Sequence, residues 1–269
     1  MNQRIIAALI AAPLVFGAIG CKTKKPEIAP ATASSDESLY KEGEKYLKKD
    51  AEKARLYMRQ IIDSFPKSFY AQRAKLAIAD SYFQESDEGS LILAAAEYGE
   101  FIRLFPYSPS AAFAQYRIGL CFFDKALKPG RDQQKTIQAL AEFKKLLSLY
   151  PLSEEAKPAR ESIKQCEERL AEHAFLIGLQ YYRTKVLKAA VNRLTEILTN
   201  YPLYSGMDKV YFYLGSSYQD WGKAEQAIPF LTKLITDFPK SKLADKAQKR
   251  LVEAQAAKAL AAAAPPVKK

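Results

Sequence analysis

Residues 190–202 read AVNRLTEILTNYP, and the same arrangement recurs at four other places in the chain. An alanine is followed by large apolar residues four, seven and eight positions later, by an aromatic residue at eleven and by a proline at twelve. The copies occupy residues 54–66, 94–106, 139–151, 190–202 and 227–239. Offsets of four, seven and eight lie on one face of an α-helix, and proline cannot continue that helix. Five such helices at regular distance predict a stacked repeat protein.

The composition agrees with an all-α fold. The 269 residues are 48% hydrophobic, which supports a continuous core, and they include only 11 glycines. Asn-Gly, a dipeptide typical of β-hairpins, is absent, which argues against an all-β fold. The expected architecture is an α-solenoid, in which each repeat buries itself against the next.

The chain is basic, with a formal net charge of +11 and a pI of about 9.3. Such charge is compatible with nucleic acid, an anionic membrane or an acidic protein. The lysines are scattered along helix faces, and no zinc-finger or aromatic RNA-binding pattern accompanies them. We therefore expect a solvated surface biased towards acidic partners and no nucleic-acid binding.

The first twenty residues have the pattern of an export signal. Arg4 precedes an apolar stretch from Ile5 to Phe16, and small residues lead to Cys21. The stretch is short for a transmembrane helix. Ala18-Ile19-Gly20-Cys21 is similar to a bacterial lipobox, whose cysteine is acylated and becomes the N-terminus; an ordinary secretory peptide is the alternative. Removal of Arg4 would leave a mature charge of 11 − 1 = +10.

Acylation of Cys21 would anchor the chain to a membrane. Lys22 follows the cysteine, and by resemblance to known lipoproteins the absence of aspartate there implies the outer membrane. Residues 21–35 are rich in Lys, Pro, Ala, Thr and Ser, and we expect them to form a flexible tether.

The helix before each copy completes a repeat unit similar to the tetratricopeptide repeat. In units four and five, Gly178 and Gly215 precede the alanine at the family's offsets, where a glycine permits close packing of two helices. The spacing in units one to three departs from that of the tetratricopeptide repeat. Insertions follow the first helix of units two and three, at residues 87–90 and 128–132, and they are either recognition loops or longer turns.

A charged stretch from Glu154 to Glu172 separates unit three from unit four. Its apolar residues recur at spacings of three and four, and Pro158 fits only a first turn. It predicts one long helix that joins two halves. The predicted organisation is a signal peptide at 1–20, a tether at 21–35, units one to three at 36–153, units four and five at 154–256 and a disordered tail at 257–269.

Residues that carry chemistry are scarce. His173 is the single histidine, and we expect it to be structural or solvated, with no metal site and no cofactor. Cys121 and Cys166 remain after acylation of Cys21. An exported chain permits a disulfide, but both occupy apolar helical positions, which favours two buried free thiols. No nucleotide fingerprint appears, so no enzyme is expected.

The chain resembles the BamD family, lipoproteins of the bacterial outer-membrane β-barrel assembly machinery, over roughly residues 36–240. The resemblance is carried by Phe101-Ile102-Arg103-Leu104-Phe105-Pro106, Gly130-Arg131-Asp132, Tyr181-Tyr182 and Ala190-Val191-Asn192-Arg193. It implies a non-enzymatic scaffold on the periplasmic face of the outer membrane. The C-terminal repeats would dock on a POTRA domain of the barrel assembly subunit, alongside other assembly lipoproteins, and the N-terminal repeats would engage unfolded barrel precursors.

Six residues are candidates for partner binding on that resemblance: Arg131, Asp132, Tyr182, Arg183, Asn192 and Arg193. Arg193 either belongs to the docking surface or stabilises the repeat through local pairs. Of the adjacent tyrosines 181 and 182, one is expected in the core and the other on the surface. At Thr199, where family members can carry a basic residue that participates in docking, this chain has none.

Two other functions remain compatible with helical repeats. One is a periplasmic scaffold for cell-envelope or division coordination, of the type that works with the Tol–Pal system, although such proteins often carry an N-terminal coiled coil that this sequence lacks. The other is an enzyme with the repeats as an appendage, but no catalytic domain remains once the repeats are counted.

Overall fold

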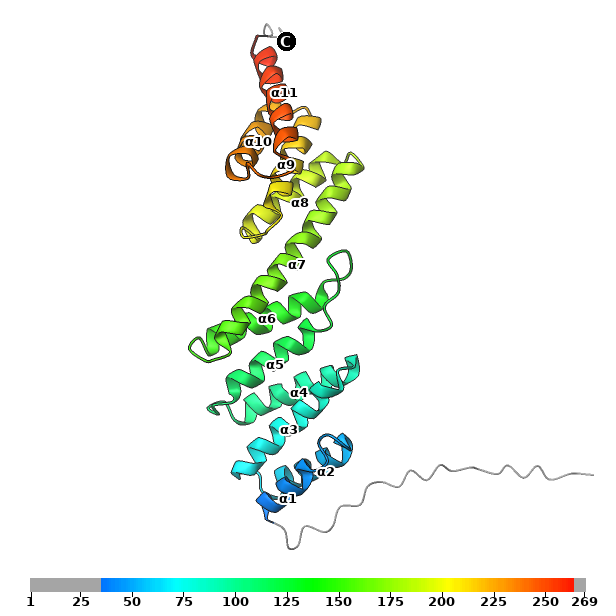
Figure 1. Ribbon diagram of the computed structural model, residues 1–269, viewed down its shortest axis with the longest axis vertical. Coiled ribbons are helices and arrows are strands. Elements are labelled where there is room, and N and C mark those ends of the chain that lie inside the picture. The colour runs from blue at the N-terminus through cyan, green and yellow to red at the C-terminus, as the bar shows by residue number, and fades with distance from the viewer. Residues whose placement is uncertain (1–34, 264–269) are drawn as a thin grey trace, which may run out of the picture.

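The computed structural model describes residues 35–263, and this part of the chain contains eleven α-helices and no strand (Figure 1). Cys21, the predicted signal peptide and nearly all of the tether lie outside the described residues. The helices are α1 (Asp36–Glu44), α2 (Ala51–Ser64), α3 (Phe69–Glu85), α4 (Glu88–Leu104), α5 (Ala111–Phe123), α6 (Gln134–Leu149), α7 (Ala156–Arg183), α8 (Leu187–Asn200), α9 (Met207–Asp220), α10 (Ala224–Asp237) and α11 (Ala244–Ala263).

Successive helices pack as neighbours, so that α1 to α10 form five pairs and α11 covers the last of them (Figure 1). Contacts between helices distant in sequence are few, as a solenoid requires. The predicted all-α solenoid of five tetratricopeptide-like helix pairs is confirmed.

The end of each second helix follows from the aromatic–proline sequence. Helices α2, α4, α6, α8 and α10 all stop at an aromatic residue with φ between −128° and −136° and a backbone N–H bonded to the carbonyl four residues earlier. The next residue is proline, which disfavours helical angles in the residue before it. The five copies of the repeated sequence therefore end five helices in turns on the same edge of the stack.

Small residues allow the two helices of a pair to approach closely. The alanines that begin the five copies of the repeated sequence are completely buried, at positions 54, 94, 139, 190 and 227. A Cβ on Gly178 would lie 2.8 Å from Leu194 Cδ2, and one on Gly215 would lie 2.7 Å from Leu231 Cγ. The predicted role of these glycines in helix packing is confirmed.

Helix α7 is the long connecting helix expected from the charged stretch, and its 28 residues include Pro158 in the first turn. Its first half packs with α6, where Ala159 and Cys166 join the cluster around Phe143. Its second half pairs with α8 and carries Phe175 into the core of unit four. The first three units and the last two thus share one helix across the boundary predicted at residue 154.

The C-terminal boundary differs from the prediction. Residues 257–263, expected in a disordered tail, continue α11 as far as Ala263. Alanine has the highest helix propensity, so an alanine-rich sequence prolongs a helix that packing has already started. Lys258 also forms an ion pair of 2.9 Å with Glu225 of α10. Residues 264–269 lie outside the described part.

Cys121 and Cys166 are both buried and free, as the apolar helical pattern favoured. Burial raises the pKa of Cys121 to about 12 and that of Cys166 to about 11, because an apolar environment disfavours the thiolate. Both thiols are therefore poor nucleophiles in the folded chain.

Candidate docking surfaces

The turn between α7 and α8 positions the first of the candidate residues. Lys185 adopts a left-handed conformation with φ of 61°, and the Val186 N–H bonds to the Tyr181 carbonyl at 2.9 Å. This arrangement closes α7 and reverses the chain. Arg183, the last residue of α7, is left exposed at the edge of the stack.

Asn192 lies on the outer face of α8. Val191 and Leu194 are buried, whereas Asn192, Thr195 and Thr199 are exposed, a spacing that places them on one stripe of the helix. Together with Tyr218 of α9 they line an open depression of about 510 Å³. Thr199, where family members can carry a basic residue, thus belongs to the same surface as Asn192.

Arg193 forms a local pair, since its Nη1 donates to Glu196 Oε2 at 2.8 Å. Both side chains are about half exposed, and an exposed pair of this spacing contributes only about 0.3–0.5 kcal/mol. The pair could be exchanged for a partner's carboxylate at little cost, so both roles foreseen for Arg193 stay open. Within residues 35–263, no hydrogen bond or ion pair joins Arg183 to Asn192 or Arg193.

One of the adjacent tyrosines is exposed and the other packs inwards, as expected. The exposed one is Tyr181, however, and the candidate for partner binding, Tyr182, is half-buried. The Tyr182 ring meets Tyr213 edge-on, with centroids 5.3 Å apart, and its hydroxyl accepts a hydrogen bond from Arg250 Nη2 at 3.3 Å. Burial, above all, raises the pKa of Tyr182. Tyr182 therefore holds α7 against α9 and α11, and Tyr181 presents the freer ring.

The loop that carries Arg131 and Asp132 is held in a fixed shape from inside. Buried Gln133 donates from Nε2 to the carbonyls of Lys128, at 2.9 Å, and Arg131, at 3.0 Å. Asp132 Oδ1 accepts from the Gln134 N–H at 2.9 Å at the start of α6. Arg131 and Lys128 are both exposed, so the loop offers two cations from an ordered turn.

His173 of α7 completes this arrangement, with its Nδ1 2.5 Å from the Pro129 carbonyl oxygen. This histidine was expected to be either structural or solvated, and its contact with Pro129 gives it a structural role. Gln133 was missed by sequence reasoning, because its importance depends on carbonyls that the loop turns towards it.

The first three units offer a second candidate surface, between the first helices of units one and two. A hollow of about 250 Å³ is lined by Tyr40 of α1, by Leu47 of the turn after α1, and by Arg73 and Asp80 of α3, among others. The Arg73 guanidinium lies 4.5 Å from the centre of the Tyr40 ring. Such an arginine presents charge and a flat apolar face together, which suits a polypeptide ligand.

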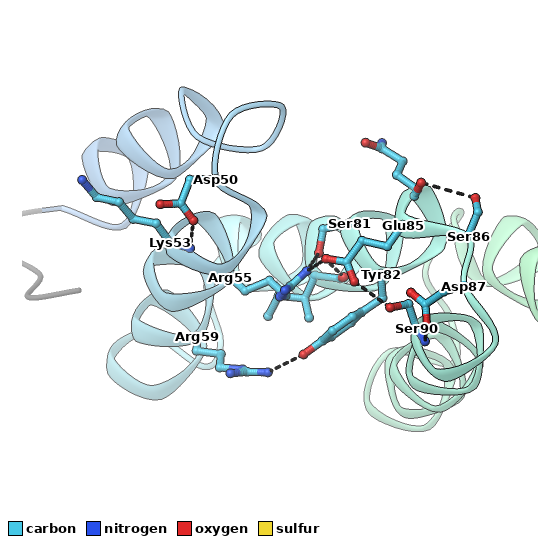
Figure 2. Close-up of polar contacts among 12 residues, drawn as sticks. Asp50, Lys53, Arg55, Arg59, Ser81, Tyr82, Glu85, Ser86, Asp87 and Ser90 are labelled. Atoms are coloured by element: carbon cyan, nitrogen blue, oxygen red, sulfur yellow. Dashed lines mark hydrogen bonds and ion pairs between the residues drawn. The ribbon is translucent and has the colours of Figure 1, made fainter. Parts of the chain in front are cut away.

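Polar contacts between α2 and α3 hold unit one on unit two (Figure 2). Arg55 Nη1 lies 2.6 Å from Glu85 Oε1, and the guanidinium covers the Tyr82 ring at 4.2 Å. Arg59 Nη2 donates to the Tyr82 hydroxyl at 3.1 Å. Hydrogen bonds from Ser90, and then from Arg55, hold the pKa of the Glu85 carboxyl below its usual value. These contacts fix the register of α2 against α3, and thereby the shape of the neighbouring hollow.

Two kinds of feature are absent from residues 35–263. No group of three or more His, Cys, Asp or Glu side chains there could hold a metal ion. None of the helices in that range combines the length and apolar character needed to cross a bilayer.

Comparison with known proteins gives a match to one family and to several named relatives. The family model YfiO, described as outer membrane lipoprotein, matches residues 32–227. Three curated relatives are each named outer membrane protein assembly factor BamD. The protein of Caulobacter vibrioides is 29% identical over 82% of this chain and 72% of its own length. The protein of Rickettsia prowazekii is 26% identical over 89% of this chain and 93% of its own length. The protein of Vibrio cholerae is 27% identical over 75% of this chain and 85% of its own length.

Two of the solved structures that the chain matches are of tetratricopeptide proteins. The TPR2AB-domain:pHSP90 complex of yeast Sti1 gives a TM-score of 0.42 at 16% identity, covering 82% of this chain and 83% of that one. A thermophilic TPR protein of Thermus thermophilus gives a TM-score of 0.33 at 15% identity, covering 82% of this chain and 99% of that one. No conclusion about function rests on these two likenesses.

Proposed function

Because the chain belongs to the YfiO family of outer membrane lipoproteins, we propose that it is the lipid-anchored scaffold on which a β-barrel assembly complex is organised. Membership of the family, the assembly-factor name of its relatives and the repeat fold indicate a scaffold rather than an enzyme. In this proposal Cys21 carries the lipid, and the folded body stands on the periplasmic face of the outer membrane.

The two candidate surfaces have different tasks in the proposal. The face of α8 that carries Asn192 and Arg193, with Arg183 at its edge, docks on a POTRA domain of the barrel assembly subunit. The hollow beside Arg73 in the first units engages unfolded barrel precursors. Arg131 and Asp132, on their fixed loop, are available to other assembly lipoproteins. The observation that carries the proposal is the pair of exposed surfaces held apart by α7 in a chain of this family.

A charge reversal at Arg193 tests the docking surface, and the chain supplies a matched control. Arg103 forms the same kind of exposed i,i+3 pair with Glu100, on α4 of the first half. We expect Arg193→Glu to reduce recovery of the POTRA-bearing barrel protein during affinity purification from detergent-solubilised outer membranes. Arg103→Glu should leave that recovery unchanged. Recovery of the tagged wild-type chain without any POTRA-bearing protein would contradict the assembly role itself.

The anchor is tested separately by fractionation. Replacing Cys21 with alanine should release the mature chain into the soluble periplasmic fraction, because no acyl chain then holds it at the bilayer. Retention of the Cys21→Ala chain on membranes washed with high salt would contradict acylation at this residue.

A further inference from the structure

A groove lies where α7 passes beneath the turn between α8 and α9. One hollow of about 400 Å³ is lined by Arg160, Ile163 and Lys164 of α7 and by residues of that turn, among others. A second of about 460 Å³ includes Arg169 of α7 and Pro129 of the fixed loop. Lys164, Glu168 and Leu203 line both hollows, so the two are adjacent, and we call them together the junction groove.

The centre of the junction groove is apolar and open to solvent. Leu203 is 87% exposed although it is a large hydrophobic residue, and Ile163 is half-buried beside it. Leu203 directly follows the proline of unit four, a position that holds lysine in units one and five. An exposed apolar side chain between two hollows is a feature of surfaces that are covered by a partner.

The acids of the junction groove are already satisfied by the protein itself. Glu167 pairs with Lys144 at 2.8 Å. Glu168 accepts a hydrogen bond from the Ser205 N–H at 3.0 Å. Glu172 accepts one from the Tyr204 hydroxyl. Among the lining acids, Glu161 alone has no ion pair or hydrogen bond with the described part of the chain.

The cations of the groove are not satisfied in this way. Arg160, Lys164 and Arg169 have no carboxylate within 4.0 Å among residues 35–263. Arg169 lies over the Phe123 ring at 5.2 Å, and its buried Nη1 has no hydrogen-bond partner in that range. Arg169 also lines the second hollow, and a carboxylate is the acceptor that a guanidinium favours.

Lys144 and Lys209 neutralise Glu167 and Glu172. Within the described part of the chain, three unpaired cations therefore face two carboxylates without a cation, Glu161 and Glu168, which leaves the groove with a small excess of positive charge.

We propose that the junction groove binds an acidic, extended segment of a partner polypeptide. A large apolar side chain of that segment packs beside Leu203, and flanking carboxylates reach Arg160 and Lys164 on one side and Arg169 on the other. The surface includes neither Asn192 nor Arg193, so the inference does not depend on the docking proposed for α8.

Peptide binding to the purified mature chain tests the proposed chemistry. The probe is a fluorescein-labelled decapeptide with one central leucine flanked by aspartates. Two matched peptides replace every aspartate with lysine or the leucine with serine. Fluorescence anisotropy should show the first peptide binding about tenfold more tightly than either matched peptide, and binding should weaken when salt is raised from about 50 mM to about 200 mM. Equal affinity for the aspartate and lysine peptides would overturn the proposal.

Variants of exposed side chains then locate the binding. Lys164→Glu should weaken binding of the acidic peptide about fivefold or more, and Leu203→Ser about tenfold. Matched controls are Lys157→Glu, which changes another exposed lysine of α7, and Leu152→Ser, which changes the equivalent exposed leucine of unit three. The controls should bind like the wild type. If the controls weaken binding as much as Lys164→Glu and Leu203→Ser do, the segment binds elsewhere and the assignment is wrong.

Discussion

Replacing Gly119 with alanine tests whether close approach of the paired helices sets the packing of the solenoid. Gly119 lies in α5 opposite Phe143 of α6. A Cβ at this position would lie 2.6 Å from Phe143 Cδ1 and 2.9 Å from Cζ. The Phe143 ring is completely buried, with the rings of Tyr116 and Phe123 at 5.6 and 6.1 Å, so it has no room to withdraw. The helices themselves would have to separate.

The expected magnitude follows from two opposing terms. Forcing an extra carbon into a packed core costs about 1–3 kcal/mol. Alanine in place of glycine stabilises a helix interior by about 0.5–1 kcal/mol. Gly119→Ala should therefore lower the free energy of unfolding by about 0.5–2 kcal/mol. Gly99 of α4 provides the control, because a Cβ there meets nothing within 4 Å. Gly99→Ala should raise the free energy of unfolding by the propensity term alone.

Urea unfolding followed by far-UV circular dichroism measures both variants. Stability in a solenoid is distributed over its units, so hydrogen exchange of α5 and α6 should accompany the urea curves and locate the loss. The difference between the two variants, about 1–3 kcal/mol, isolates the overpacking cost. If Gly119→Ala stabilised the chain as much as Gly99→Ala, the glycine would not be required for helix approach and the reasoning would be refuted.

Three further outcomes follow from the buried groups. Burial, and then the nearby Asp80 carboxylate to which the hydroxyl donates, raise the pKa of Tyr98, so the folded chain keeps the phenol protonated beyond about pH 10, where the unfolded chain ionises it. That stabilisation is complete below about pH 10 and is lost progressively above it. Tyr98→Phe should lower the free energy of unfolding by about 1–3 kcal/mol, and the urea midpoint of the variant should fall less steeply at alkaline pH. An unchanged alkaline slope would contradict this. Because burial raises the pKa of Cys121 and Cys166, neither should react with a disulfide reagent near neutral pH until denaturant is added, and rapid labelling of the folded chain would show that the thiols are accessible. Arg250→Ala removes the hydrogen bond of 2.8 Å from Nη1 to Asp220 Oδ1 and should speed hydrogen exchange in α11 about tenfold or more; exchange that also quickened in α1 to α6 would argue against a local effect.

The parts of the fold that local rules decide could be predicted from the sequence. The aromatic–proline ends of five helices, the close approach at Gly178 and the long helix through Pro158 each depend on residues within one helix or one pair. The end of α11 differs from the expectation, because the composition of residues 257–269 predicts a disordered tail, whereas the high helix propensity of alanine prolongs the helix to Ala263.

The candidate surfaces were less predictable, since they depend on contacts between residues far apart in the chain. Nothing near Gln133 in the sequence indicates that its side-chain amide donates hydrogen bonds to the carbonyls of a loop. The role of Tyr182 depends on Arg250, 68 residues later. Family resemblance therefore points to Tyr182 as a partner residue, although Tyr181 is the exposed one of the two. The junction groove forms only because α7 and the turn after α8 meet in space, and periodicity within one helix gives no signal of that meeting.

The continuity of α7 has a mechanical consequence. At about 1.5 Å per residue, its 28 residues form a strut about 42 Å long, without a loop at which the two halves could bend. A rotation imposed on the last two units is therefore passed to the first three through this helix. In the proposed assembly complex, a movement of the barrel subunit against the last two units would therefore also displace the precursor-binding hollow of the first units.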